Sequence, residues 1–321
     1  MFWIDEIDSH LAARAEGKTL THALMLAGRP GVGKRWLAAR VARRFLGLDI
    51  EQAESGILDV ADDLMQTPDF HRVSVVEGKQ QISIEQVREL TSQFTLKSHA
   101  AAGKLALIEP ADAMTTAAAN SLLKTLEEPQ SESLLILVVD DMAKIPATIA
   151  SRTTIYRLLP PTTSESAGWL ANQTDSTRED IALALLIANG APLAARDLLT
   201  SDDIAVARQV NTDIVAIATG REGPMQVAGR WRKLSPRLVM NGLRAFVQQL
   251  IYARFAPELR SSSDFGDYVM DTRDAFCYLD QVNRLIARTP GSYNPELAME
   301  AMLLPWAQGL RGYRKQQKRM G

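Results

Sequence analysis

A glycine-rich turn between an apolar strand and a helix most constrains how this chain can fold. The turn, Gly28-Arg29-Pro30-Gly31-Val32-Gly33-Lys34, has the glycine spacing and the lysine of a phosphate-binding P-loop. The apolar run Leu24 to Ala27 precedes it, and a helical pattern follows it to about Gly47. Backbone N–H groups and a helix N-terminus surround phosphate in such a motif. We therefore predict four cofactor-binding residues, Gly28, Gly31, Gly33 and Lys34. The alternative is a glycine-rich turn between core elements.

Two positions in this region depart from what ATP hydrolysis requires. Arg35 occupies the place where a serine or threonine would hold Mg²⁺. A second motif, Lys104 to Pro110, is typical of the metal-binding strand of a P-loop NTPase, but it ends in Glu-Pro where an active ATPase carries Asp-Glu. Glu109 can still coordinate a metal, whereas Pro110 cannot polarise water. We predict weakened Mg²⁺ binding, with Glu109 as the remaining acid of the strand.

Apolar runs of strand length alternate with helical patterns up to about residue 158, which favours βα units and a parallel sheet. The predicted strands are Leu24 to Ala27, Val73 to Val76, Leu105 to Ile108 and Leu134 to Val139. Because the last two are continuously apolar, we expect them to be central strands with helices on both faces. Ser83 and Gln86 have the spacing of a capping box, and Thr116 to Glu128 predicts a helix.

The turn residues Pro160 to Ser164 mark the best domain boundary, and the pattern beyond them is helical. A chain of 321 residues is long enough for two or three domains. The sequence therefore predicts one α/β domain, a small helical domain and a C-terminal helical domain.

Composition excludes several classes of protein. A net charge of −2 does not mark the chain as a DNA binder. The single cysteine, Cys277, excludes a disulfide framework and a multi-cysteine zinc site, and its helical context predicts a buried structural thiol. The first residues are acidic where a signal peptide would be basic, and the longest apolar stretches are too short to span a bilayer. We expect a soluble, cytoplasmic protein.

Four motifs occur in order over about residues 20 to 160. They are His22-Ala23-Leu24-Met25-Leu26-Ala27-Gly28, Thr67-Pro68-Asp69-Phe70, Asn120-Ser121-Leu122-Leu123-Lys124-Thr125-Leu126-Glu127-Glu128-Pro129 and Ser151-Arg152-Thr153. Together they resemble the AAA+ clamp-loader family of bacterial DNA polymerase III. The Leu-Leu-Lys-Thr-Leu-Glu-Glu-Pro run is highly specific, and Thr153 stands where the family carries the cysteine of a Ser-Arg-Cys signature.

The resemblance implies an AAA+ P-loop NTPase-like domain over residues 1–160, a helical lid over 161–203 and a C-terminal helical collar over 204–321. It also implies a fixed, largely non-hydrolysing subunit of the DNA-directed DNA polymerase (nucleotidyltransferase) holoenzyme that helps to load the sliding clamp on primed DNA. Its partners would be clamp-loader ATPase subunits and a delta subunit in a hetero-oligomer. The complex would bring it to the sliding clamp and to primer-template DNA, and no membrane partner is expected.

The family's site residues carry over position by position. Active relatives have an ATP-sensing arginine where this chain has Leu193, so the resemblance adds a third departure to Arg35 and Pro110 and implies no independent ATPase. Arg152 is retained, and in the family this arginine reaches the γ-phosphate bound by a neighbouring subunit. We therefore expect Arg152 to act catalytically in trans. The alternative is a surface arginine paired with a carboxylate.

Relatives often carry a cysteine-rich zinc module after the P-loop helix, but the corresponding stretch, Leu48 to Met65, contains no cysteine. We expect no zinc and no required cofactor, and we leave open whether ATP or ADP binds without hydrolysis. Near the C-terminus, four cations at helical spacing predict a basic stripe on a helix: Arg311, Arg314, Lys315 and Lys318, with Arg319 adjoining. Such a stripe could contact phosphate, but cations that offset the helix dipole are the simpler interpretation.

Two other functions remain open from the sequence. One is a working DNA-dependent AAA+ ATPase in which Glu109 and Asp112 replace the usual acids. The other is a nucleotide-binding adaptor outside replication that uses the P-loop only as a structural ligand site. ATP turnover would favour the first, and failure to join other clamp-loader subunits would favour the second.

Overall fold

The computed structural model describes the chain apart from residues 18, 50–61, 95–102, 131, 256–270, 288–293, 309, 311–312 and 314–321. The chain forms two compact units, Met1–Pro161 and Thr162–Gly321, and the boundary between them in the sequence directly follows the proline pair Pro160-Pro161. The further division of the second unit near residue 203 stays a prediction.

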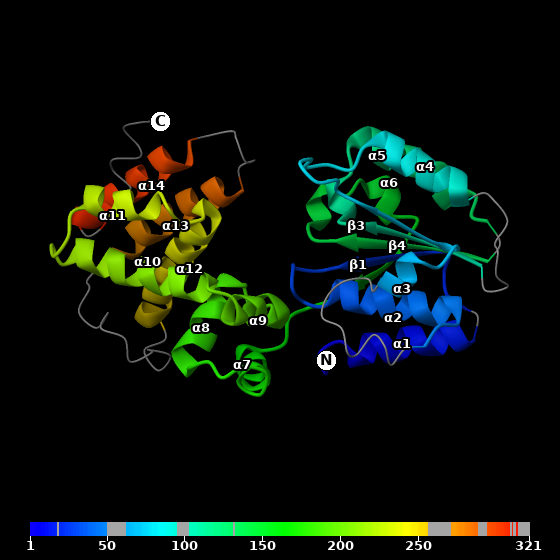
Figure 1. Ribbon diagram of the computed structural model, residues 1–321, viewed down its shortest axis with the longest axis horizontal. Helices are drawn as coiled ribbons and strands as arrows, with labels where there is room; N and C mark the ends of the chain where they lie inside the picture. Colours follow the sequence, from blue (N-terminus) through cyan, green and yellow to red (C-terminus); the bar gives the residue numbers. More distant parts are fainter. Residues whose placement is uncertain are drawn as a thin grey trace. The chain divides into compact units, whose positions relative to one another are not determined.

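The first unit is built on a five-stranded sheet in which every described pairing is parallel (Figure 1). In spatial order the strands are β2 (Phe70–Ser74), β3 (Lys104–Glu109), β4 (Ser133–Val139), β1 (Ala23–Ala27) and β5 (Thr154–Arg157). The parallel sheet predicted from the sequence is thereby confirmed. The strand β2 is shifted from its predicted position: it covers Phe70–Ser74, whereas the prediction was residues 73–76. Val76 lies past the end of the strand and is 53% exposed.

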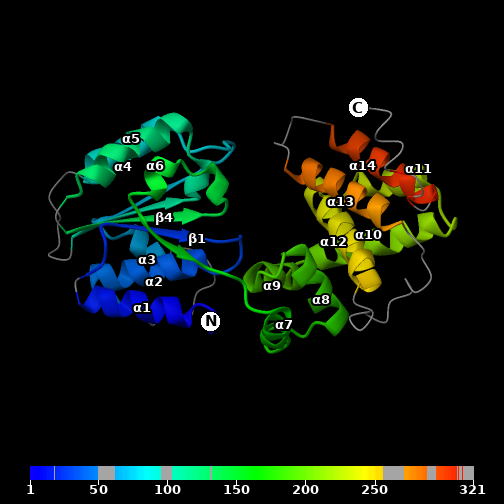
Figure 2. The same cartoon turned by 180° about the vertical axis from the view of Figure 1, so that it is seen from behind.

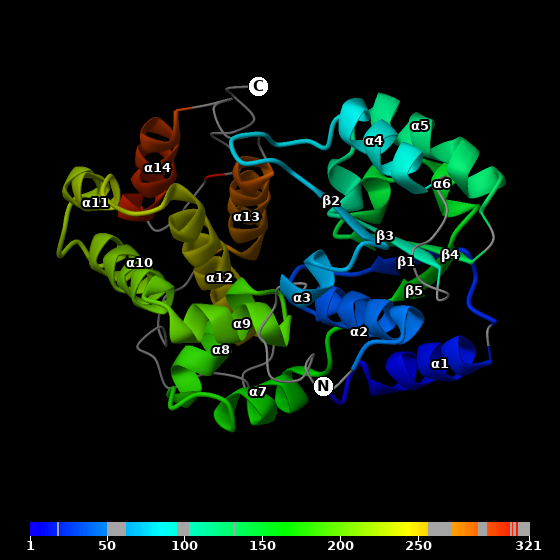
Figure 3. The ribbon, with the colours of Figure 1, turned by 45° about the vertical axis from the view of Figure 1, so that its right-hand side comes forward.

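Helices cover both faces of the sheet, as Figures 1 and 2 show. On one face lie α4 (Ile84–Phe94), α5 (Thr116–Glu127) and α6 (Ala147–Ala150), and their apolar residues pack with Met25, Ile108 and Leu137 in one buried cluster. On the other face α2 (Lys34–Leu46) packs against β1, β3 and β4, with the short α3 (Asp62–Met65) nearby. The helix α1 (Asp5–Glu16) packs on α2 and lies outside it (Figure 3).

Local hydrogen bonds fix where the helices of this unit begin. The predicted capping box is present: the Ser83 backbone N–H donates to Gln86 Oε1 at 3.0 Å, and the Gln86 N–H donates to Ser83 Oγ at 3.4 Å. Thr115 caps α5 by accepting from the Ala118 N–H at 3.2 Å. These caps satisfy backbone N–H groups that the first turns of the two helices would otherwise leave without an acceptor.

The second unit is helical throughout its described residues. Its helices are α7 (Thr163–Ala171), α8 (Arg178–Ile187), α9 (Pro192–Thr200), α10 (Asp203–Ala218), α11 (Pro224–Trp231), α12 (Pro236–Phe255), α13 (Thr272–Ile286) and α14 (Pro295–Leu303), followed by a 3₁₀ segment, Leu304–Gln308. A small apolar cluster lies among α7, α8 and α9, and it also includes Ala207 and Ala245 from the longer helices. Within the described part of the chain, no helix is long and apolar enough to cross a membrane.

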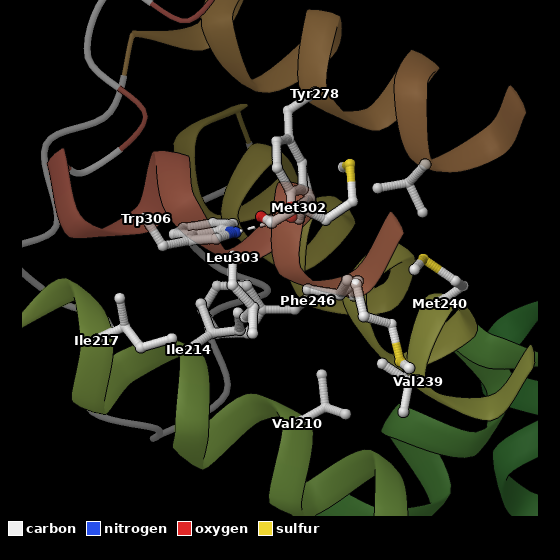
Figure 4. Close-up of a cluster of buried hydrophobic side chains, with 14 of the residues drawn as sticks. Val210, Ile214, Ile217, Val239, Met240, Phe246, Tyr278, Met302, Leu303 and Trp306 are labelled. Carbon is white, nitrogen blue, oxygen red and sulfur yellow. Dashed lines mark hydrogen bonds between the residues drawn. The ribbon is translucent and has the colours of Figure 1, made fainter. Parts of the chain in front are cut away.

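A larger core joins the remaining helices around three aromatic rings (Figure 4). The Trp306 ring meets Phe246 and Tyr278 edge to face, with centroids 5.3 and 5.4 Å apart. The Trp306 indole N–H donates to the Tyr278 hydroxyl at 2.9 Å, and that hydroxyl donates to the Met302 carbonyl at 2.7 Å. Both polar atoms are therefore satisfied in a fully buried setting, where burial raises the pKa of Tyr278. Cys277 is half-buried beside this core.

A buried carboxylate also ties α10 to α11. Asp213 is 1% exposed and accepts from the Trp231 indole N–H at 2.8 Å and from Arg230 at 2.5 Å. Gln209 donates to the same carboxylate at 2.8 Å. Removing the acid would leave the Trp231 indole N–H without its acceptor, whereas Arg230 would keep its second partner, Glu222, at 2.6 Å.

Candidate functional site

The predicted P-loop connects β1 to α2, and its glycines are required by the backbone. Gly31 and Gly33 have φ of 81° and 97°, a region that other residues rarely adopt. At Gly28 a Cβ atom would lie 2.4 Å from the Leu158 carbonyl oxygen, so the close approach of the residue that follows β5 demands glycine. No side chain caps α2 at Gly33. The turn therefore has the backbone of a phosphate loop whether or not it binds phosphate.

Lys34 is folded back onto this loop. Its ammonium group donates to the carbonyl oxygens of Gly28 and Arg29 at 2.6 and 2.8 Å, and it lies 2.7 Å from a carboxylate oxygen of Asp140. The side chain is only 4% exposed. Burial lowers the pKa of Lys34, and the bond to Asp140 opposes that effect.

Asp140 was not among the residues predicted from the sequence. It follows β4, the strand beside β1, so parallel pairing brings it to the P-loop edge of the sheet. Its backbone N–H donates to Asp112 Oδ1 at 2.8 Å, which draws a second carboxylate toward the same edge. A polar residue directly after the apolar run Leu134 to Val139 was the available signal.

Glu109, the predicted acid of the metal strand, is held between two guanidinium groups. Its side chain is completely buried at the end of β3. Arg35 Nε lies 3.2 Å from one carboxylate oxygen, and Arg72 Nη2 lies 2.5 Å from the other. Arg35 comes from α2, and Arg72, which the sequence did not indicate, comes from β2. Positive charge from the chain thus surrounds the acid that would otherwise attract a divalent cation.

The N-terminal segment also contacts the loop. The Trp3 indole N–H donates to the Val32 carbonyl at 3.0 Å, and the Phe2 ring meets the Trp3 ring edge to face at 5.1 Å. One carbonyl of the loop is therefore bonded to a residue outside the motif.

Arg152 lies on the surface of the first unit, directly after α6. Its guanidinium group is 2.8 Å from Glu127 Oε1 and donates to the Thr148 carbonyl at 3.0 Å. Glu127 ends α5 and belongs to the conspicuous Glu-Glu-Pro run. The arginine thus has the surface ion pair that the alternative interpretation foresaw, and its role in trans stays a prediction.

Other predicted positions fall elsewhere in the structure. Leu193, which replaces an arginine of active relatives, is 1% exposed in α9 of the second unit. Most of the stretch Leu48 to Met65 lies outside the described residues, as do the four cations of the C-terminal stripe and Arg319. Among the residues that are described, no three histidine, cysteine or acidic side chains are grouped as a metal site would need.

Comparison with known proteins identifies the first unit. Residues 4–162 match the family model for the DNA polymerase III delta subunit. The first unit belongs to this family. The match confirms the resemblance that the sequence motifs indicated over the same residues.

Relatives named DNA polymerase III subunit delta' agree with this placement. The Escherichia coli protein is 28% identical over 204 residues, which are 63% of this chain and 61% of the relative. The Pseudomonas aeruginosa protein is 32% identical over 200 residues, or 61% and 60% of the two chains. The chain thus aligns with about six tenths of the length of these relatives.

The fold has a counterpart among solved structures. A DNA polymerase III gamma subunit-related protein from Thermotoga maritima superposes with a TM-score of 0.53, covering 95% of this chain and 99% of that one. Because the two sequences are only 14% identical, the likeness concerns the fold alone.

Proposed function

We propose that this chain is the delta'-type subunit of a DNA polymerase III clamp loader, a fixed subunit that hydrolyses no ATP itself and helps to place the sliding clamp on primed DNA. The family of the first unit and the names of the relatives support the choice of complex. In this proposal residues 161–203 form a lid and residues 204–321 a collar that joins the other subunits. The chain requires no cofactor and no zinc.

The state of the P-loop carries the non-hydrolysing part of the proposal. The ammonium group of Lys34 is shared among two loop carbonyls and Asp140, and Glu109 is neutralised by Arg35 and Arg72. Hydrolysis needs the lysine on phosphate and an acid on Mg²⁺. Both groups are engaged within the chain, so we expect no turnover, even if ATP or ADP binds.

The partner side of the proposal rests on Arg152. The guanidinium group is on the surface, where it pairs with the exposed carboxylate of Glu127 and donates to groups of its own turn. A phosphate of a neighbouring subunit could therefore replace Glu127. An arginine is suited to this exchange because its planar fork matches a phosphate as well as a carboxylate.

Two measurements test the function as a whole. The full chain, mixed with clamp-loader ATPase and delta subunits, should form a complex by light scattering, and alone it should show no ATPase above background with or without primed DNA. Turnover of about 1 s⁻¹ that Lys34→Ala abolishes would instead identify a working ATPase. Failure to join the complex would favour an adaptor outside replication.

A further inference from the structure

We propose that Asp140 keeps the P-loop closed, so that the loop is a latent binding site for polyphosphate whose lysine is withheld by an internal acid. This goes beyond the absence of hydrolysis, since it names one side chain that stands between the loop and a ligand. It applies to the isolated chain and does not depend on assembly into a complex.

The first support is the number of donors on Lys34. An ammonium group has three N–H donors, and here it has three acceptors at 2.6, 2.8 and 2.7 Å. A phosphate can gain this lysine only by displacing one of them. Asp140 is the strongest competitor because it alone carries a full negative charge.

The second support is the charge around the loop. Asp140 and Asp112 lie next to each other, joined by the Asp140 backbone N–H, and both raise the pKa of Lys34 against the effect of burial. An incoming polyphosphate would meet two carboxylates there. Asp140 is 37% exposed on its side chain, so a ligand could reach and displace it.

The third support is that the remainder of the loop is intact. Gly31 and Gly33 keep the left-handed conformation, Gly28 keeps the close approach to Leu158, and no side chain caps α2. Backbone geometry of this kind favours an anion at a helix N-terminus. Because Glu109 is paired with Arg35 and Arg72, it is not available to hold a divalent cation, so we expect Mg²⁺ to add nothing to binding at this loop.

The test compares ATP binding, measured by calorimetry with and without Mg²⁺, for the wild type and for Asp140→Asn. The isosteric amide removes the charge, so we expect ATP to bind about tenfold more tightly or better, equally with and without Mg²⁺. Inorganic tripolyphosphate should show the same gain, since the base is not involved. In the double variant Asp140→Asn/Lys34→Ala the gain should disappear.

Asp141→Asn is the matched control, because Asp141 is adjacent, carries the same charge and lies half-exposed at the start of a 3₁₀ turn. A similar gain in this variant would reduce the effect to net charge and overturn the proposal. The proposal would also be overturned if wild type and Asp140→Asn bound ATP with equal affinity, or if the gain in affinity persisted in Asp140→Asn/Lys34→Ala. Asp112→Asn supplies a second test that leaves Asp140 in place, and we expect a smaller gain in the same direction.

Discussion

At the scale of single residues, two arginines replace a metal ion as the partners of the buried Glu109 carboxylate. A buried carboxylate without a partner would be costly, and in an ATPase a metal ion relieves that cost. Here Arg35 and Arg72 do so permanently. The substitution of arginine after the P-loop lysine thus does more than remove a hydroxyl group, because it supplies a fixed countercharge to the acid of the neighbouring strand.

Arg152 gives the prediction that belongs to this scale. In a complex whose other ATP sites are disabled, Arg152→Ala should lower hydrolysis at the adjoining site by about 10³–10⁵, the usual contribution of an arginine finger. Arg152→Lys should restore little, since an ammonium group lacks the planar fork. Arg157→Ala, which removes another exposed arginine of the same unit, is the control. Unchanged hydrolysis with assembly preserved would show that the Glu127 pair is the whole role of Arg152.

At the scale of elements, a carboxylate holds α1 on α2. Asp8 accepts from Arg40 at 3.0 Å and from Arg44 at 2.9 Å. Burial raises the pKa of Asp8, but the hydrogen bonds from Arg44 and Arg40 outweigh it and hold that pKa below its ordinary value. A lowered pKa in the folded state means that the contribution is present above the unfolded pKa and is lost in acid.

We therefore expect Asp8→Asn to lower the free energy of unfolding of the first unit at pH 7 by about 1–3 kcal/mol. The difference from wild type should shrink as the pH falls below about 4 through the folded pKa. Urea titrations at several pH values provide the measurement. A difference that stays constant into acid would mean that the Asp8 charge is unimportant.

The elements also show what sequence patterns can predict. The apolar run of β4 and the Ser83–Gln86 capping box were predictable because each depends on neighbours in sequence. The edge strand β5 was not, since Thr154–Arg157 is only partly buried and has no apolar run. The loop glycines of the site were found in the same local way, whereas Asp140 and Arg72 reach it through the strand order, which no local pattern encodes.

At the scale of the whole molecule, the two units have separate cores. One apolar cluster lies between the sheet and the helices α4, α5 and α6, and two others lie within the helical unit; among the described residues, none of these three clusters draws on both units. A short connection after Leu158 joins them. Units with their own cores are expected to unfold as separate cooperative steps.

We thus predict two transitions in a urea titration of the full chain. Asp213→Ala should lower the stability of the second unit by about 1–3 kcal/mol, because it leaves the buried Trp231 indole N–H without its acceptor and removes one of the two carboxylates paired with Arg230. It should leave the first transition in place. Asp8→Asn should lower the stability of the first unit and leave the transition of the second unit in place. Tryptophan emission follows the second unit well, since Trp231 and Trp306 are fully buried. One transition moved by both variants would show that the units unfold together.

The bond between Trp3 and Val32 gives the P-loop an optical reporter of its own. Indole emission depends on the polarity around the ring, and this ring is anchored to a carbonyl of the phosphate loop. A loop that rearranges around an anion alters that anchor, so the contribution of Trp3, one of the five tryptophans, to the emission spectrum changes with the state of the loop.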